Sequence, residues 1–103
     1  MKYTANTYAK LSMESAESLY RELLTTDCGG FMVEEASAPR IISSQDSIVL
    51  DVKFSDLSTA VEFNASPYDT SFYGRVLYDV ALAGVFGEVQ DFRVPDDLEV
   101  TAV

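Results

Sequence analysis

Carboxylates are the most abundant reactive side chains of this chain, whose 103 residues include 17 Asp and Glu against seven Lys and Arg. The sequence has no histidine and a single cysteine, Cys28. Ser–His and Cys–His nucleophile pairs and His-ligated metal sites are therefore excluded, and the commonest general base near neutral pH is missing. One cysteine also forms neither an intrachain disulfide nor a Cys-rich zinc site.

Cys28 stands directly before Gly29-Gly30. A reactive thiol at this position would need a positively charged neighbour to lower its pKa, and the sequence places none beside it. We therefore interpret Cys28 as a small apolar residue before a turn.

Two chemical interpretations of the carboxylates fail on their spacing. Calcium loops place oxygen ligands at alternate positions around a glycine and end on a glutamate. The densest acidic stretch, which contains Asp91, Asp96, Asp97 and Glu99, does not follow that pattern. A glycosidase needs two carboxylates with separated pKa values, and no spacing here marks such a pair. We expect no metal, no cofactor and no enzymatic activity.

Two further interpretations of the carboxylates concern the protein surface. Acids two apart on a strand lie about 6.6 Å apart, and acids three or four apart on a helix lie about 5–6 Å apart, which resembles a row of phosphates. Such rows would fit the basic groove of a nucleic-acid-binding protein. The alternative is a solvated acidic surface that only keeps the protein soluble. The candidate partner-binding residues are Glu14, Glu17, Glu34, Glu35, Asp91, Asp96, Asp97 and Glu99.

Among these candidates, Glu34 and Glu35 are the weaker pair. Neighbouring residues on a regular strand point to opposite faces, so one of the two side chains would face away from any shared row.

The overall charge and hydropathy exclude other partners. The net charge is -10, which disfavours direct binding to nucleic acid or to an anionic membrane. No run approaches 18 apolar residues, and the first six residues lack the apolar core of a signal peptide, so we expect a cytoplasmic protein. With 48% hydrophobic residues, the chain is expected to form one domain over residues 1–103.

Two amphipathic helices are predicted to carry part of these residues. The first spans 13–26, begins after a Ser12 N-cap and is stopped by Gly29-Gly30. The second spans about 70–83 and stops at Gly84. Gly74 weakens this second helix by about 1 kcal/mol relative to alanine, which suggests close packing at that position.

A β-hairpin is predicted from residues 48–54 and 59–65. Alternation in both segments and a loop at 55–58 would set Val52 opposite Val61 and Leu50 opposite Phe63. A short helix capped by Ser55 is the competing interpretation of the second segment.

Weaker strand signals complete the chain. They cover 1–10, 31–36 before a break at Pro39, 88–94 before Pro95, and an alternating acidic tail at 96–103. The expected fold is therefore α+β, a small antiparallel sheet with two amphipathic helices packed on one face. The other sheet face would meet solvent or a partner.

One segment resembles a known class of protein. Tyr73-Gly74-Arg75-Val76-Leu77-Tyr78, followed by Ala81, Ala83-Gly84 and Phe86-Gly87, is similar to a segment of small phage tail-accessory proteins. The whole chain resembles phage-encoded inhibitors of bacterial defence, especially anti-CRISPR proteins, in its size, acidity and lack of catalytic motifs.

The second resemblance implies a non-enzymatic inhibitor in the cytoplasm of a bacterial host. It would bind a Cas effector complex or another basic nucleic-acid-binding protein and block its DNA or RNA site. The alternatives are a phage tail or assembly accessory, which would bind through apolar surface, and an acidic adaptor or homodimer without mimicry.

Overall fold

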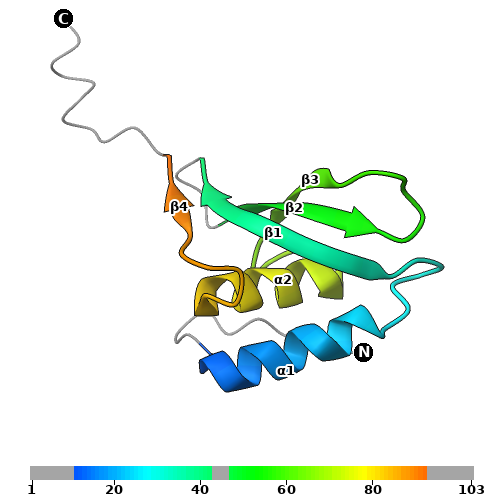
Figure 1. The fold of residues 1–103 in the computed structure, drawn as a ribbon, viewed down its shortest axis with the longest axis horizontal. Coiled ribbons are helices and arrows are strands. Elements are labelled where there is room, and N and C mark those ends of the chain that lie inside the picture. The colour runs from blue at the N-terminus through cyan, green and yellow to red at the C-terminus, as the bar shows by residue number, and fades with distance from the viewer. Residues whose placement is uncertain (1–10, 43–46, 93–103) are drawn as a thin grey trace, which may run out of the picture.

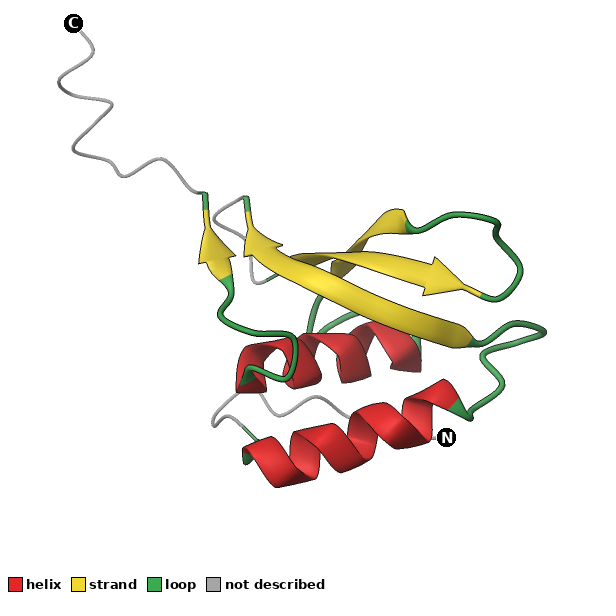
Figure 2. Cartoon of the chain, in the orientation of Figure 1, coloured by secondary structure: helices red, strands yellow, loops and turns green. Residues whose placement is uncertain are grey.

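The computed structural model describes residues 11–42 and 47–92, in which a layer of two helices lies against one face of a four-stranded sheet (Figures 1 and 2). The strand order is β3-β2-β1-β4. The predicted α+β class is confirmed, whereas the strand predicted at 1–10 and the tail at 96–103 lie outside the described residues. The elements are α1 (Met13–Leu24), β1 (Val33–Ile41), β2 (Ile48–Phe54), β3 (Val61–Ala65), α2 (Phe72–Ala83) and β4 (Gln90–Asp91).

The predicted N-cap of α1 at Ser12 and the predicted end of α2 at Gly84 are confirmed, whereas the C-cap of α1 at Thr25 and the N-cap of α2 at Ser71 were not predicted. The Ser12 hydroxyl accepts the backbone N–H of Ser15 at 3.1 Å, and α1 ends two residues before the predicted position 26. The Ser71 hydroxyl accepts the N–H of Gly74 at 3.3 Å. Gly84 ends α2 with a φ of 96°, a left-handed conformation that glycine adopts without steric cost.

Gly74 is required by the loop before α2, as its predicted close packing implies. A Cβ at this position would clash with the carboxylate of Asp69. Asp69 is held in place because one of its carboxylate oxygens accepts hydrogen bonds from both the N–H and the hydroxyl of Ser71, at 2.9 and 2.8 Å.

The core lies between the sheet and the helices. Leu23 of α1, Leu50 and Val52 of β2 and Leu77 and Val80 of α2 are fully buried. Each such side chain contributes about 1.5–3 kcal/mol through burial. One end of this core is closed by aromatic rings whose centroids lie 5.5–5.9 Å apart, from Phe31, Phe54, Phe63 and Tyr73. All of these contacts are edge-to-face except the tilted pair of Phe63 and Tyr73.

The β2–β3 hairpin has the predicted register. Val52 pairs with Val61 and Leu50 with Phe63, and the pairing is continuous from Val52–Val61 to Ile48–Ala65. The loop covers 55–60, so β3 begins two residues later than predicted. A short helix at this position, the competing interpretation, does not form.

The prediction that β1 stops before Pro39 is wrong, because the strand continues to Ile41. Its register with β2 slips beside Pro39, where Ser37 pairs with Asp51 and the next pair is Arg40 with Val49. A proline is tolerated at such a bulge because its missing N–H removes no ladder bond.

The sheet is mixed, which differs from the predicted antiparallel sheet. β4 pairs in parallel with β1, through Arg40–Gln90 and Ile41–Asp91. Parallel neighbours need a crossover connection, and α2 supplies it by carrying the chain back beneath the sheet. β4 is also shorter than the predicted strand at 88–94, of which 93 and 94 lie outside the described residues.

Candidate acidic binding surface

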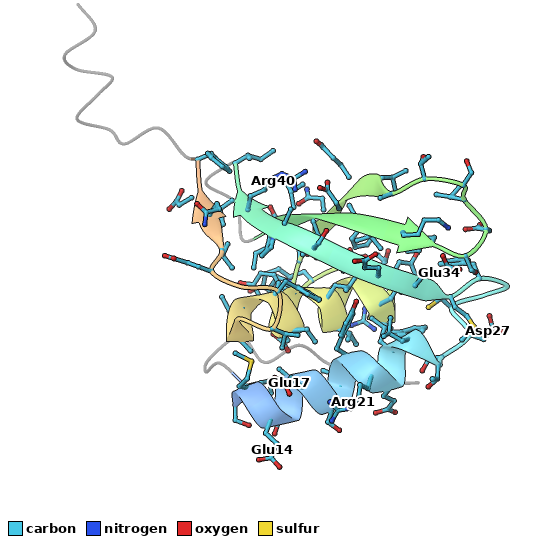
Figure 3. All side chains as sticks on the ribbon, viewed as in Figure 1. Glu14, Glu17, Arg21, Asp27, Glu34 and Arg40 are labelled. Carbon is cyan, nitrogen blue, oxygen red and sulfur yellow. The ribbon has the colours of Figure 1, made fainter. Side chains whose placement is uncertain are left out.

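Three exposed carboxylates follow the solvent side of α1. Glu14 and Glu17 are both exposed, as predicted, and Figure 3 shows their side chains on the helix surface. Glu22, which is not among the predicted partner-binding residues, is exposed on the same helix. None of the three forms an ion pair with a described residue, and Glu17 and Arg21 do not pair although they are four residues apart. The α1 acids are therefore Glu14, Glu17 and Glu22.

The expectation that Glu34 and Glu35 point to opposite faces is wrong. Val33 pairs with Phe54 and Glu35 with Lys53, so Glu34 is an extra residue in β1. Such a β-bulge turns two consecutive side chains to one side. Both glutamates are exposed beside Lys53, on the sheet face away from the helices, which we call the outer face.

The acids of the outer face are largely paired with cations. Lys53 Nζ contacts Glu34 Oε1 at 3.0 Å. The guanidinium of Arg40 lies 3.1 Å from Asp51 and 3.4 Å from Glu62, so it links two strands to β1. Asp51 and Lys53 share a face because they are two residues apart on β2, but Arg40 and Glu62 are distant in sequence and no local pattern indicates their contact.

Charge is therefore segregated in the described part of the chain. It contains 13 of the 17 acids and four of the seven bases, or -9 of the total -10. Arg40 and Lys53 are engaged on the outer face, and Arg75 donates to the carbonyl of Asp69. Arg21, on α1, forms no ion pair with a described residue.

The remaining predicted residues do not join this surface. Asp91 is exposed on β4, at the far edge of the sheet from β3. Asp96, Asp97 and Glu99 lie outside the described residues.

Cys28 lies in a structured turn and is half-buried. Burial raises the pKa of its thiol, which lowers the fraction of reactive thiolate. Beside it, the carboxylate of Asp27 accepts the N–H groups of Gly29 and Gly30 at 3.1 and 2.7 Å, and these bonds lower the pKa of Asp27. The interpretation of Cys28 as a turn residue fits this environment.

Within residues 11–42 and 47–92, no three potential metal-ligating side chains gather in one place. The helices of this described part are too short or too polar to cross a membrane. No protein-family model, curated protein or solved structure matches the chain.

Proposed function

We propose that this protein is a non-enzymatic inhibitor that binds a basic, nucleic-acid-binding protein, such as a bacterial defence complex, through the α1 acids. The observation that carries the proposal is the different state of the acids on the two surfaces. On the outer face, Glu34, Asp51 and Glu62 contact Arg40 or Lys53, whereas the α1 acids have no cationic partner among the described residues. Free carboxylates are the ones available to a basic groove.

The spacing on α1 supports competition with nucleic acid. Glu14 and Glu17 are three residues apart on a helix, which sets their side chains about 5–6 Å apart. A partner that binds phosphates with Lys and Arg would meet a similar density of negative charge. Association would be steered by the field of the -10 chain and would weaken as salt rises.

The test is capture from a bacterial lysate on the immobilised protein at about 50 mM salt, followed by salt steps and addition of competing duplex DNA or RNA. We expect nucleic-acid-binding proteins to be retained at low salt and released by both treatments. The test variant is Glu14→Gln with Glu17→Gln. The matched control is Asp56→Asn with Glu88→Gln, which makes the same charge change at exposed positions elsewhere.

Loss of capture in the α1 variant and retention in the control supports the proposal. Equal capture by both variants, or capture that competing nucleic acid does not affect, would return these acids to a role in solubility.

A phage assembly accessory is the second candidate, because two large apolar side chains are exposed at the β1–β4 end. Ile42 and Phe92 are 57% and 60% exposed, and Phe92 donates its N–H to the carbonyl of Ile41 at 2.8 Å. An apolar contact would be nearly independent of salt, and the salt steps therefore separate the two candidates.

A further inference from the structure

The free edge of β3 has the regularity of a strand that can accept another strand. β3 is the outermost strand on its side of the sheet, and its pairing with β2 runs over five residues without a register shift. No described residue outside β2 forms a backbone hydrogen bond with Val61–Ala65. An edge strand of this kind presents a row of unpaired N–H and C=O groups.

The side chains of β3 are complementary to themselves when the strand is turned around. In an antiparallel pair centred on Phe63, Glu62 lies opposite Asn64 of the second copy, and Val61 lies opposite its Ala65. The carboxylate then meets an amide that can donate to it, and this happens twice because of the two-fold symmetry. No acid opposes an acid.

Alternative registers are less favourable. Residues directly opposite in an antiparallel pair point to the same face. If the helix layers of both copies are to lie on one side of the sheet, some residue must therefore lie opposite its own copy, with the two-fold axis between them. Centring on Glu62 would oppose two carboxylates. Centring on Asn64 would place Val61 opposite Pro67, which has no N–H to contribute.

We propose that β3 pairs with β3 of a second copy of this chain, antiparallel and centred on Phe63, to form one continuous eight-stranded sheet. The pairing adds roughly four to six backbone hydrogen bonds, because hydrogen-bonded pairs alternate along an antiparallel ladder. The exposed part of Val61 and the half-buried Phe63 rings would be covered together. The α1 acids lie outside this contact, on the helix layer.

Salt acts on this contact in the opposite sense to the proposed inhibitor binding. Each copy carries -10, so screening reduces the repulsion between copies and should strengthen the dimer. Failure of one proposal is therefore distinguishable from failure of the other.

The first test is sedimentation equilibrium of the full chain at about 50 mM and about 500 mM salt. We expect a monomer–dimer equilibrium that shifts toward dimer at the higher salt. Asn64→Glu places like charges opposite each other twice and should raise the dimer dissociation constant about tenfold. Adding Glu62→Lys to that variant makes each opposed pair oppositely charged and should restore the dimer.

Gln90→Glu is the matched control, because it makes the same charge change on the exposed edge strand β4. It should leave the dimer nearly unchanged. A chain that is monomeric at both salt concentrations, or a dimer that Asn64→Glu does not weaken, would overturn the proposal and leave the edge to a segment of another protein.

The second test measures the register directly, in a Cys28→Ala background. Glu62→Cys and Asn64→Cys chains are prepared separately and oxidised alone or as a mixture. Opposed strand residues are close enough for a disulfide, so the proposed register predicts cross-linked dimers chiefly in the mixture. Cross-linking of Glu62→Cys or Asn64→Cys chains chiefly with themselves would contradict the register centred on Phe63.

Discussion

The two long edges of the sheet are built differently. On the β1 side, only Arg40 and Ile41 are paired with β4, and the rest of β1 has no strand neighbour among the described residues on the side away from β2. This stretch contains two bulges, two consecutive glutamates and Pro39, each of which discourages pairing with another chain. On the β3 side, the strand is short, regular and free of proline.

A side chain of α1 also occupies one backbone N–H of the β1 edge. Tyr20 of α1 accepts the backbone N–H of Ala36 on its hydroxyl at 3.0 Å. A donor that would otherwise point to an open edge is thereby satisfied. The bulges and the hydrogen bond to Tyr20 therefore lie on the edge with the longer strand, where unwanted pairing would be the most extensive. The pairing of β3 with β2 has no such irregularity.

The largest expected loss of stability comes from weakening the packing of α1, the helix that carries Tyr20, against the core. Leu23 anchors α1 and is fully buried. Leu23→Ala should lower the free energy of unfolding by about 2–5 kcal/mol through lost burial and a residual cavity. Urea denaturation measures this loss, with Leu57→Ala, at a 40% exposed leucine, as the control. A loss below about 0.5 kcal/mol would contradict the position of α1 on the core.

Removing only the hydrogen bond between Tyr20 and Ala36 should lower the free energy of unfolding by less than Leu23→Ala does. Tyr20→Phe leaves the Ala36 N–H without its acceptor and should reduce the free energy of unfolding by about 1 kcal/mol. Tyr68→Phe is the matched control, because Tyr68 is 73% exposed and its hydroxyl meets water. Equal effects of the two variants would mean that Tyr20 does not protect the edge energetically.

The sequence predicts the regular strand β3 well and the irregular strand β1 poorly. The hairpin that ends in β3 follows a two-residue alternation, and this period sets its register. In β1, the buried residues are Val33, Ala36 and Pro39, three apart, because each bulge inserts a residue between them. That spacing matches neither a strand nor a helix, so the pattern could not reveal the length of β1.

The predicted partner-binding residues likewise include some whose position follows from the sequence and some whose position does not. Glu14 and Glu17 were placed correctly because capping signals fix the start of α1 and its periodicity fixes the solvent side. The sequence does not reveal that Glu34 and Glu35 share a face, because a bulge depends on the partner strand. The pairing of Arg40 with Glu62 joins residues 22 positions apart, and only the assembled sheet brings them together.

A smaller effect is expected where the β1 backbone is strained. Ala38 has a φ of 54°, a left-handed conformation that costs a residue with a Cβ about 1–2 kcal/mol. Ala38→Gly relieves this cost but adds chain entropy to the unfolded state, so we expect a net gain of about 0.5 kcal/mol. Ala60→Gly, in the exposed loop, should instead be neutral or destabilising. Thermal melting of both variants checks the sign, and a loss at Ala38 would contradict the strain.

The smallest expected effect is a pH dependence of the stabilisation that the hydrogen bond between Tyr20 and Ala36 provides. Burial raises the pKa of the Tyr20 hydroxyl, and the charge of Glu35 adds to the rise, while the Ala36 N–H opposes it. The folded state therefore keeps a proton that the unfolded state loses first. The stabilisation is fully present below the unfolded pKa of about 10 and is lost as pH rises through the folded value.

Other tyrosines and lysines titrate in the same range, so the useful quantity is the difference in unfolding free energy between the wild type and Tyr20→Phe. Urea denaturation at about pH 8 and about pH 11 measures this difference on both sides of the unfolded tyrosine pKa. We expect the advantage of the wild type to shrink at the higher pH, because only the wild type must retain the Tyr20 proton to remain folded. An advantage that stays constant would mean that the hydroxyl titrates alike in both states, and burial against the β1 edge would then not raise the pKa of Tyr20.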